Sequence, residues 1–147
     1  MDNRTAAAFM GIVEGYSLLV AAVDRHLREI GGVSQPQYEI LVRLSHAPEG
    51  MRMGDLAAVL VFSASGLTYQ ATQLEKRGLV ERVRAPGGDE RTVVARLTPA
   101  GTTLVAEVQP RHLAFVQDLF ASRLSPDDIA SLGDSLAALV AGLRAAG

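Results

Sequence analysis

The feature that most constrains this chain is a change of hydrophobic period within residues 63–101, where a helical pattern is followed by two strand patterns. Leu67, Ala71 and Leu74 recur at three- and four-residue steps after a serine-rich start, which predicts a helix with one buried face. Gly78 supplies the stop signal at its end. The polar residues on the opposite face of this helix are then available for recognition.

Two strands are predicted directly after this helix. Apolar and charged residues alternate over residues 79–84, and residues 92–97 are rich in β-branched types. The turn residues 85–90 separate them and continue neither pattern. A helix fits the major groove of DNA, and a slim loop carrying Arg91 can reach a backbone or a minor groove nearby.

Four short pieces of this stretch carry a resemblance through their order, spacing and identity. They are Ser65-Gly66-Leu67-Thr68, Leu74-Glu75-Lys76-Arg77-Gly78-Leu79-Val80-Glu81-Arg82, Asp89-x-Arg91 and Leu97-Thr98-x-x-Gly101. Together they resemble the MarR family of winged helix-turn-helix transcription regulators. The resemblance implies one domain over residues 1–147, mainly α with a small antiparallel β wing. Dimerisation helices would occupy residues 1–32 and 99–147, and the winged helix-turn-helix would occupy residues 33–98.

Helices are predicted on the N-terminal side of this stretch. An amphipathic pattern over residues 3–30 is stopped by two glycines, and a second helix begins near Ser34. Residues 51–53 are expected to add a short third strand to the hairpin. Residues 54–60 form the first helix of the helix-turn-helix.

Two more helices are predicted on the C-terminal side. The first begins with Thr98 as cap and runs to about residue 122, with Pro110 predicting a kink or a break. The second begins at Ser125. The terminal helices hold more apolar surface than one small winged domain can cover, so we predict a homodimer. The alternative is a monomer in which these helices cap the winged domain.

The candidates for DNA contact are polar residues of two predicted parts. One is the helix that carries Leu67, Ala71 and Leu74, called the reading helix, and the other is the wing, formed by the two strands and the loop between them. The candidates are Ser63, Ser65, Thr68, Tyr69, Gln70, Gln73, Arg82, Arg84, Asp89 and Arg91. Glutamine suits adenine edges, and threonine or tyrosine can touch a thymine methyl group. The resemblance implies a minor-groove role for Arg91 and a supporting role for Asp89. The alternative for each residue is an ordinary solvated surface position.

The sequence departs from the family pattern inside the reading helix. Tyr69 follows Thr68 where many members have arginine, and Gln73 stands where a basic residue is common. The loss of positive charge should lower nonspecific affinity and change base preference.

The resemblance also implies a response to small molecules, often aromatic acids or phenols, bound between the dimer helices and the winged domain. Candidate lining residues are Tyr16, His26, Tyr38, Arg43 and His112. A histidine or tyrosine with a polar tip on an apolar face is more often a structural residue, and this is the alternative for each of them. The three histidines lie far apart without the spacing of a metal site, so no metal and no cofactor is expected.

Composition narrows the class of protein. With 147 residues, 48% hydrophobic and 20% charged, the chain is long and apolar enough to bury a core. Cysteine is absent, which excludes disulfides and thiol sensing. No uncharged apolar run suggests a membrane span and no signal segment is apparent, so a cytoplasmic protein is expected.

The charge distribution supports a nucleic-acid partner for one part of the chain. The net charge is −2, yet residues 63–98 hold six basic and four acidic residues, which leaves −4 for the rest. We therefore predict a dimeric regulator of a pseudo-palindromic double-stranded DNA site, a repressor released by a small molecule. The alternative is a winged-helix scaffold that binds protein. Since the sequence has no nucleophile elbow, phosphate loop or carboxylate constellation, no enzyme is expected.

Overall fold

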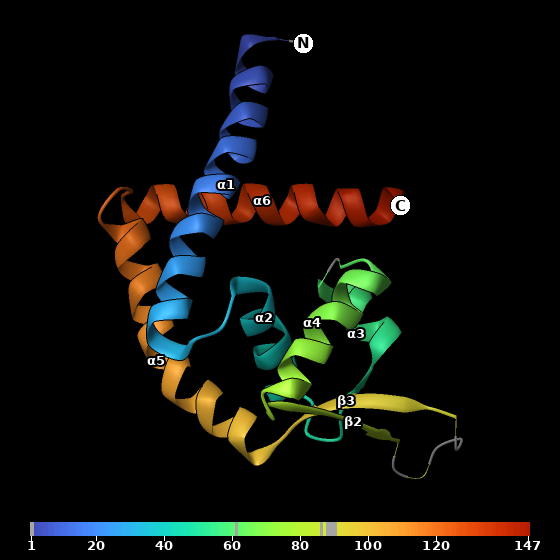
Figure 1. Ribbon diagram of the computed structural model, residues 1–147. Coiled ribbons are helices and arrows are strands. Elements are labelled where there is room, and N and C mark those ends of the chain that lie inside the picture. Colours follow the sequence, from blue (N-terminus) through green and yellow to red (C-terminus); the bar gives the residue numbers. More distant parts are fainter. Residues whose placement is uncertain (1, 61, 86, 88–90) are drawn as a thin grey trace. The chain divides into compact units, whose positions relative to one another are not determined.

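The computed structural model describes residues 2–60, 62–85, 87 and 91–147. Within them, the chain is mainly helical and has one small sheet (Figure 1). The elements in chain order are α1 (Asn3–Gly31), α2 (Gln35–Ser45), β1 (Met51–Arg52), α3 (Met53–Leu60), α4 (Ala64–Lys76), β2 (Val80–Arg84), β3 (Val93–Leu97), α5 (Pro99–Ala121) and α6 (Pro126–Ala146). The mainly helical class with a small β wing is thereby confirmed.

The core of the first part of the chain is organised around α2. This helix contacts α1, α3, α4 and β3, and its side chains Ile40, Leu41 and Leu44 are almost fully buried. Leu56 of α3 and Leu74 of α4 are buried in the same part of the chain. Burial of side chains of this size stabilises a fold by about 1.5–3 kcal/mol each.

The sheet is the predicted hairpin completed by a third strand. Its strand order is β1-β3-β2, and both pairings are antiparallel. β3 is central, with Ala95 facing Met51 on one side and Arg82 on the other.

The capping residues expected from sequence begin the helices that they precede. The hydroxyl Oγ of Ser34 accepts from the backbone N–H of Gln37, and that of Ser125 accepts from Asp128. In both cases the third helical residue reaches back to the cap, which makes a capping box. These contacts explain why α2 and α6 begin where the sequence predicts.

The motif Thr98-x-x-Gly101 joins the hairpin to α5. Thr98 Oγ1 accepts from the N–H of Gly101 at 3.1 Å and donates to the carbonyl oxygen of Gly78 at 2.6 Å. A Cβ at Gly101 would lie 2.1 Å from the carbonyl oxygen of Leu79. Glycine is therefore required for the first turn of α5 to approach the end of the α4–β2 connection.

Of the kink or break predicted at Pro110, the break does not occur, because α5, whose residues are all described, runs as one helix through this residue. Proline removes one helical hydrogen bond, and the rest of the helix tolerates the loss. The chain divides into two compact units at this residue, Met1–Pro110 and Arg111–Gly147.

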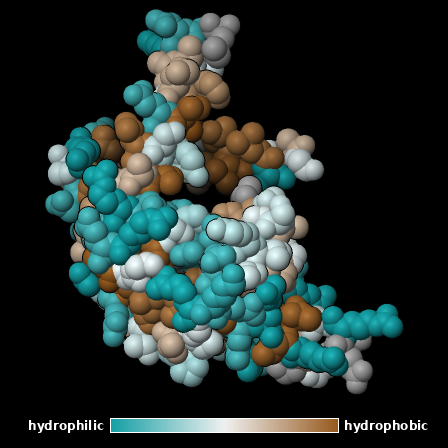
Figure 2. All heavy atoms as spheres, in the orientation of Figure 1, coloured by the Kyte–Doolittle hydropathy of each residue, from teal (hydrophilic) through white to brown (hydrophobic). Residues whose placement is uncertain are grey.

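Two helices carry large apolar side chains on their exposed surface (Figure 2). On α1 these are Phe9, Met10, Ile12, Val13, Tyr16 and Leu18. On α6 they are Leu132, Leu136, Leu139, Val140 and Leu143, and no residue of this fully described helix is buried.

Both helices also have the length and apolar composition of a membrane span. The expectation that no such stretch exists was too strong, because long amphipathic helices meet the same criteria as membrane helices. One or two such helices are weak evidence for a membrane protein.

Candidate nucleic-acid interface

The helix α4 presents one buried face and one polar exposed face, as the sequence predicts. Leu67, Ala71 and Leu74 are at most 1% exposed and attach the helix to the core. On the other side Thr68 and Tyr69 are exposed, and Tyr69 keeps 62% of its surface in solvent. An aromatic side chain with so much open surface is suited to contact a base edge or a thymine methyl group.

The other candidates on α4 are placed less uniformly. Ser65 is exposed, whereas Gln70 and Gln73 are half-buried. Ser63 is the N-cap, and its hydroxyl accepts from the N–H of Gly66 at 3.0 Å. Ser63 therefore has a structural role whether or not it also meets DNA.

Two threonine hydroxyls on α4 are turned back to the helix backbone. Thr68 Oγ1 donates to the carbonyl oxygen of Ala64 at 2.9 Å, and Thr72 Oγ1 donates to that of Thr68 at 2.8 Å. With the proton used in this way, the Thr68 oxygen can still accept a hydrogen bond from a base amino group.

An ion pair ties α4 to the strand β2. Arg82 Nε donates to Glu75 Oε2 at 2.9 Å, and the backbone N–H of Arg82 donates to Glu75 Oε1 at 3.2 Å. The guanidinium also reaches Thr72 Oγ1 at 3.4 Å. The Arg82 guanidinium holds the pKa of the Glu75 carboxyl below its usual value, and the carboxylate in turn raises the pKa of Arg82.

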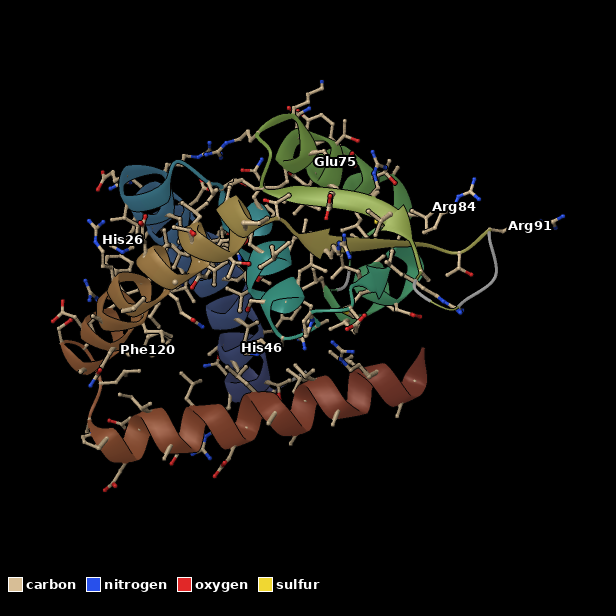
Figure 3. The ribbon with its side chains drawn as sticks, turned by 90° about the horizontal axis from the view of Figure 1, so that it is seen from below. His26, His46, Glu75, Arg84, Arg91 and Phe120 are labelled. Carbon is tan, nitrogen blue, oxygen red and sulfur yellow. The ribbon has the colours of Figure 1, made fainter. Side chains whose placement is uncertain are left out.

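This arrangement changes the interpretation of Arg82. The sequence suggests a phosphate contact, but the side chain is half-buried and directed to Glu75 (labelled in Figure 3). Its main role in the structure is to hold α4 against the hairpin. The corresponding pair between Glu81 and Arg96, at 2.8 Å, links the two strands across the hairpin.

Exposed cations lie at the far end of the hairpin. Arg84 ends β2 and Arg91 precedes β3, and both side chains point away from the sheet (Figure 3). A hairpin end with two arginines is suited to phosphate backbone or a narrow minor groove. Asp89, for which the resemblance implies a supporting role, lies outside the described residues.

The candidate effector residues do not share one environment. In the first unit, Tyr16 is 67% exposed on α1, Arg43 is exposed, and His26 is half-buried. Tyr38 is buried, and this burial raises the pKa of its phenol. His112 is buried and belongs to the second unit.

Two residues that support the interface were missed as site residues. Glu75 pairs with Arg82, and Arg77 Nη1 donates to the carbonyl oxygen of Gly32 at 2.6 Å. Both lie in the quoted motif that follows Leu74, and its opposite charges at Glu75 and Arg82 were the available signal. Sequence spacing alone does not show which acid meets which base across a turn.

Comparisons with known proteins agree with this geometry. The MarR family model matches residues 33–93. The crystal structure of AbsC, a MarR family regulator from Streptomyces coelicolor, is 32% identical and covers 99% of this chain and 97% of its own, with a TM-score of 0.87. Sco3205, a MarR family regulator from the same organism solved in complex with DNA, is 29% identical over 98% of this chain and 90% of its own, with a TM-score of 0.88.

A curated relative belongs to the same class of transcriptional regulators. YsmB of Bacillus subtilis, described as an uncharacterised HTH-type transcriptional regulator, is 29% identical and covers 80% of this chain and 88% of its own length. MarR family regulators are DNA-binding transcription factors and not enzymes. With a reading helix, a winged hairpin and nearly full-length similarity to AbsC, this chain belongs to the MarR family of transcriptional regulators.

Proposed function

We propose that this chain is a homodimeric repressor that reads a pseudo-palindromic DNA site and leaves it when a small molecule binds. The exposed polar face of α4 beside the arginine-bearing end of the hairpin is the observation that carries the proposal. Residues 33–98 are the DNA-binding part of a single MarR-type domain, and residues 1–32 and 99–147 are its dimerisation helices. The protein acts in the cytoplasm, where its DNA is.

In the proposed complex α4 lies in the major groove. Thr68, Tyr69 and Gln73 then face base edges, while Arg84 and Arg91 meet phosphates or the minor groove. The Glu75–Arg82 pair keeps helix and hairpin at a constant separation, so that both engage the duplex together. Sequence selectivity comes from the helix, and most of the affinity comes from the cations.

The proposed dimer is supported by the apolar surface of α1 and α6. On α6, Leu132, Leu136, Leu139 and Leu143 recur at three- and four-residue steps and therefore form one stripe along the helix. A monomer would leave this stripe in water, whereas a second copy covers it with the same surface. Two α4 helices related by a twofold axis then meet half-sites about 34 Å apart.

The proposed effector is an aromatic or phenolic small molecule. Two proteins of this fold have been solved with ligands, PcaV from Streptomyces coelicolor with its natural ligand and CouR from Rhodococcus jostii RHA1 with p-coumaroyl-CoA. Each is 23% identical to this chain, a level that indicates a shared fold. Tyr16, His26, Tyr38, Arg43 and His112 remain the candidate contacts. Binding would favour a dimer geometry in which the two α4 helices no longer match the operator.

The test is selection of DNA from a random pool by the full chain, followed by binding at stepwise salt. We expect a palindromic motif, and an affinity that falls steeply as salt rises because counterions are released. Thr68→Ala should change base preference at one position of each half-site by about 1–3 kcal/mol. Thr102→Ala is the matched control, since Thr102 is exposed and its hydroxyl also donates to the carbonyl oxygen four residues earlier, that of Thr98.

The competing function is a winged-helix scaffold that binds protein, which the acidic net charge favours. Selection that enriches no motif, together with weak binding that does not depend on salt, would support the scaffold and overturn the DNA-binding proposal.

A further inference from the structure

The corner between α1 and α2 is held together by polar contacts. Asp24 on α1 accepts from the backbone N–H of Gln35 at 2.8 Å and from Nε of Arg28 at 2.7 Å. These two hydrogen bonds, first that of Arg28, hold the pKa of Asp24 below its usual value. Gly32 ends α1 in the left-handed conformation, with φ 64°, and its N–H donates to the carbonyl oxygen of Arg28 at 3.0 Å.

The same corner is packed closely against α5. A Cβ at Gly31 would lie 2.7 Å from a methyl carbon of Val108, and Val33 and Leu27 are fully buried. The end of α1 therefore cannot move without moving α2 and the first part of α5.

One long-range hydrogen bond connects this corner to the end of the reading helix. Arg77 is the C-cap of α4, and its Nη1 donates to the carbonyl oxygen of Gly32 at 2.6 Å, 45 residues away in the chain. The guanidinium is also close enough to Gly32 that a Cβ there would lie 3.4 Å from Nη2. The bond joins the C-terminal end of α1 to the C-terminal end of α4.

We propose that Arg77 is a positioning residue that sets the angle of α4 relative to α1. This inference rests on the proposed function, since α1 matters for DNA only if it forms the dimer. A hydrogen bond from an exposed side chain adds little stability, but it restricts rotation of a short helix about its packed face. A dimer that reads two half-sites needs α4 to be restricted in this way, because a small rotation of each α4 changes the distance between the two α4 helices.

The neighbouring residue provides a matched control. Lys76 is also basic and exposed at the end of α4, and its side chain makes no hydrogen bond or ion pair with the residues that the structure describes. Lys76→Ala and Arg77→Ala thus remove the same charge from almost the same place, but only the second removes the bond to Gly32.

The experiment measures how strictly the full-length dimer requires its half-site spacing. The selected operator is compared with one that has a base pair inserted between the half-sites, for wild type, Arg77→Ala, Arg77→Lys and Lys76→Ala. We expect wild type and Lys76→Ala to prefer the selected spacing to the same degree. Arg77→Ala should lose at least about fivefold of that preference, and Arg77→Lys should lie between. Equal melting temperatures and a retained dimer exclude a folding defect.

Two results would overturn the inference. Arg77→Ala could instead weaken binding to both operators equally and reduce the slope of log affinity against log salt concentration by about one. In that case Arg77 contacts a phosphate. If Arg77→Ala behaves like Lys76→Ala, the bond to Gly32 does not position α4. A wild-type chain that is monomeric or fails to bind its selected operator would instead refute the proposed function, so the two failures are distinguishable.

Discussion

At the scale of residues, the Glu75–Arg82 pair makes stability depend on pH. The pKa of Glu75 is lowered in the folded chain, mainly by its hydrogen bond with Arg82, so the stabilisation is present above the usual glutamate pKa of 4.5. It is lost as the pH falls through the lowered value. The free energy of unfolding of wild type should exceed that of Glu75→Gln by about 1 kcal/mol at pH 7. This difference should vanish in acid, where Glu75 is protonated.

Thermal or urea unfolding at pH 7 and at pH 3 measures this difference. Glu107→Gln is the control, since Glu107 is exposed on α5. A difference between wild type and Glu75→Gln that is the same at both pH values would show that the charge of Glu75 is not what holds α4.

Substitution of Arg91 is a second test at the scale of residues. Its side chain is exposed and points outward from the hairpin, so Arg91→Ala should change the free energy of unfolding by no more than about 0.5 kcal/mol, as is usual for surface substitutions. Loss of a cation from the minor groove should nevertheless weaken operator binding more than tenfold, that is by more than about 1.4 kcal/mol. Fluorescence anisotropy with labelled operator measures the change, with Arg25→Ala as a control at another exposed position. An unchanged affinity would show that the hairpin does not contact the DNA.

At the scale of elements, the join between the hairpin and α5 depends on Gly101. A Cβ there would overlap the carbonyl oxygen of Leu79, so Gly101→Ala should destabilise the protein by about 1–3 kcal/mol through forced displacement of α5. Gly133→Ala is the matched control, since Gly133 lies within α6 and a Cβ there meets nothing within 4 Å. This second change should stabilise the helix by up to about 1 kcal/mol. Chemical unfolding measures the free energy of unfolding of both variants. If Gly101→Ala and Gly133→Ala changed it equally, α5 would not lie as close to the Leu79 carbonyl oxygen as the structure has it.

At the scale of the whole molecule, the proposed dimer depends on the exposed apolar surface of α6. Leu139 lies within the apolar stripe of α6, and Leu139→Glu would place a charge in the proposed interface. Sedimentation at micromolar concentration should then report a chain of 15.6 kDa where wild type is twice as heavy. Ala137→Glu, about 200° away around the helix, should remain dimeric. A monomeric wild type would refute the dimer.

The elements and their order could be predicted from sequence because local signals determine them. Serine caps, the periodic apolar residues of α4 and the turn before β3 act over a few residues, and the structure has the helices and strands where these signals predict. At Pro110, where a kink or a break was predicted, α5 is not broken. One missing hydrogen bond did not outweigh those made by the rest of α5.

The pairing of side chains was decided only by the tertiary structure. The sequence alone determined a buried and an exposed face on α4, because helical periodicity assigns every residue to a side. It did not determine that Arg82 would be held by Glu75, or that Arg77 would reach Gly32 across 45 residues. Such contacts depend on where separate helices and strands meet, and that is set by the packing of the shared core rather than by any local pattern.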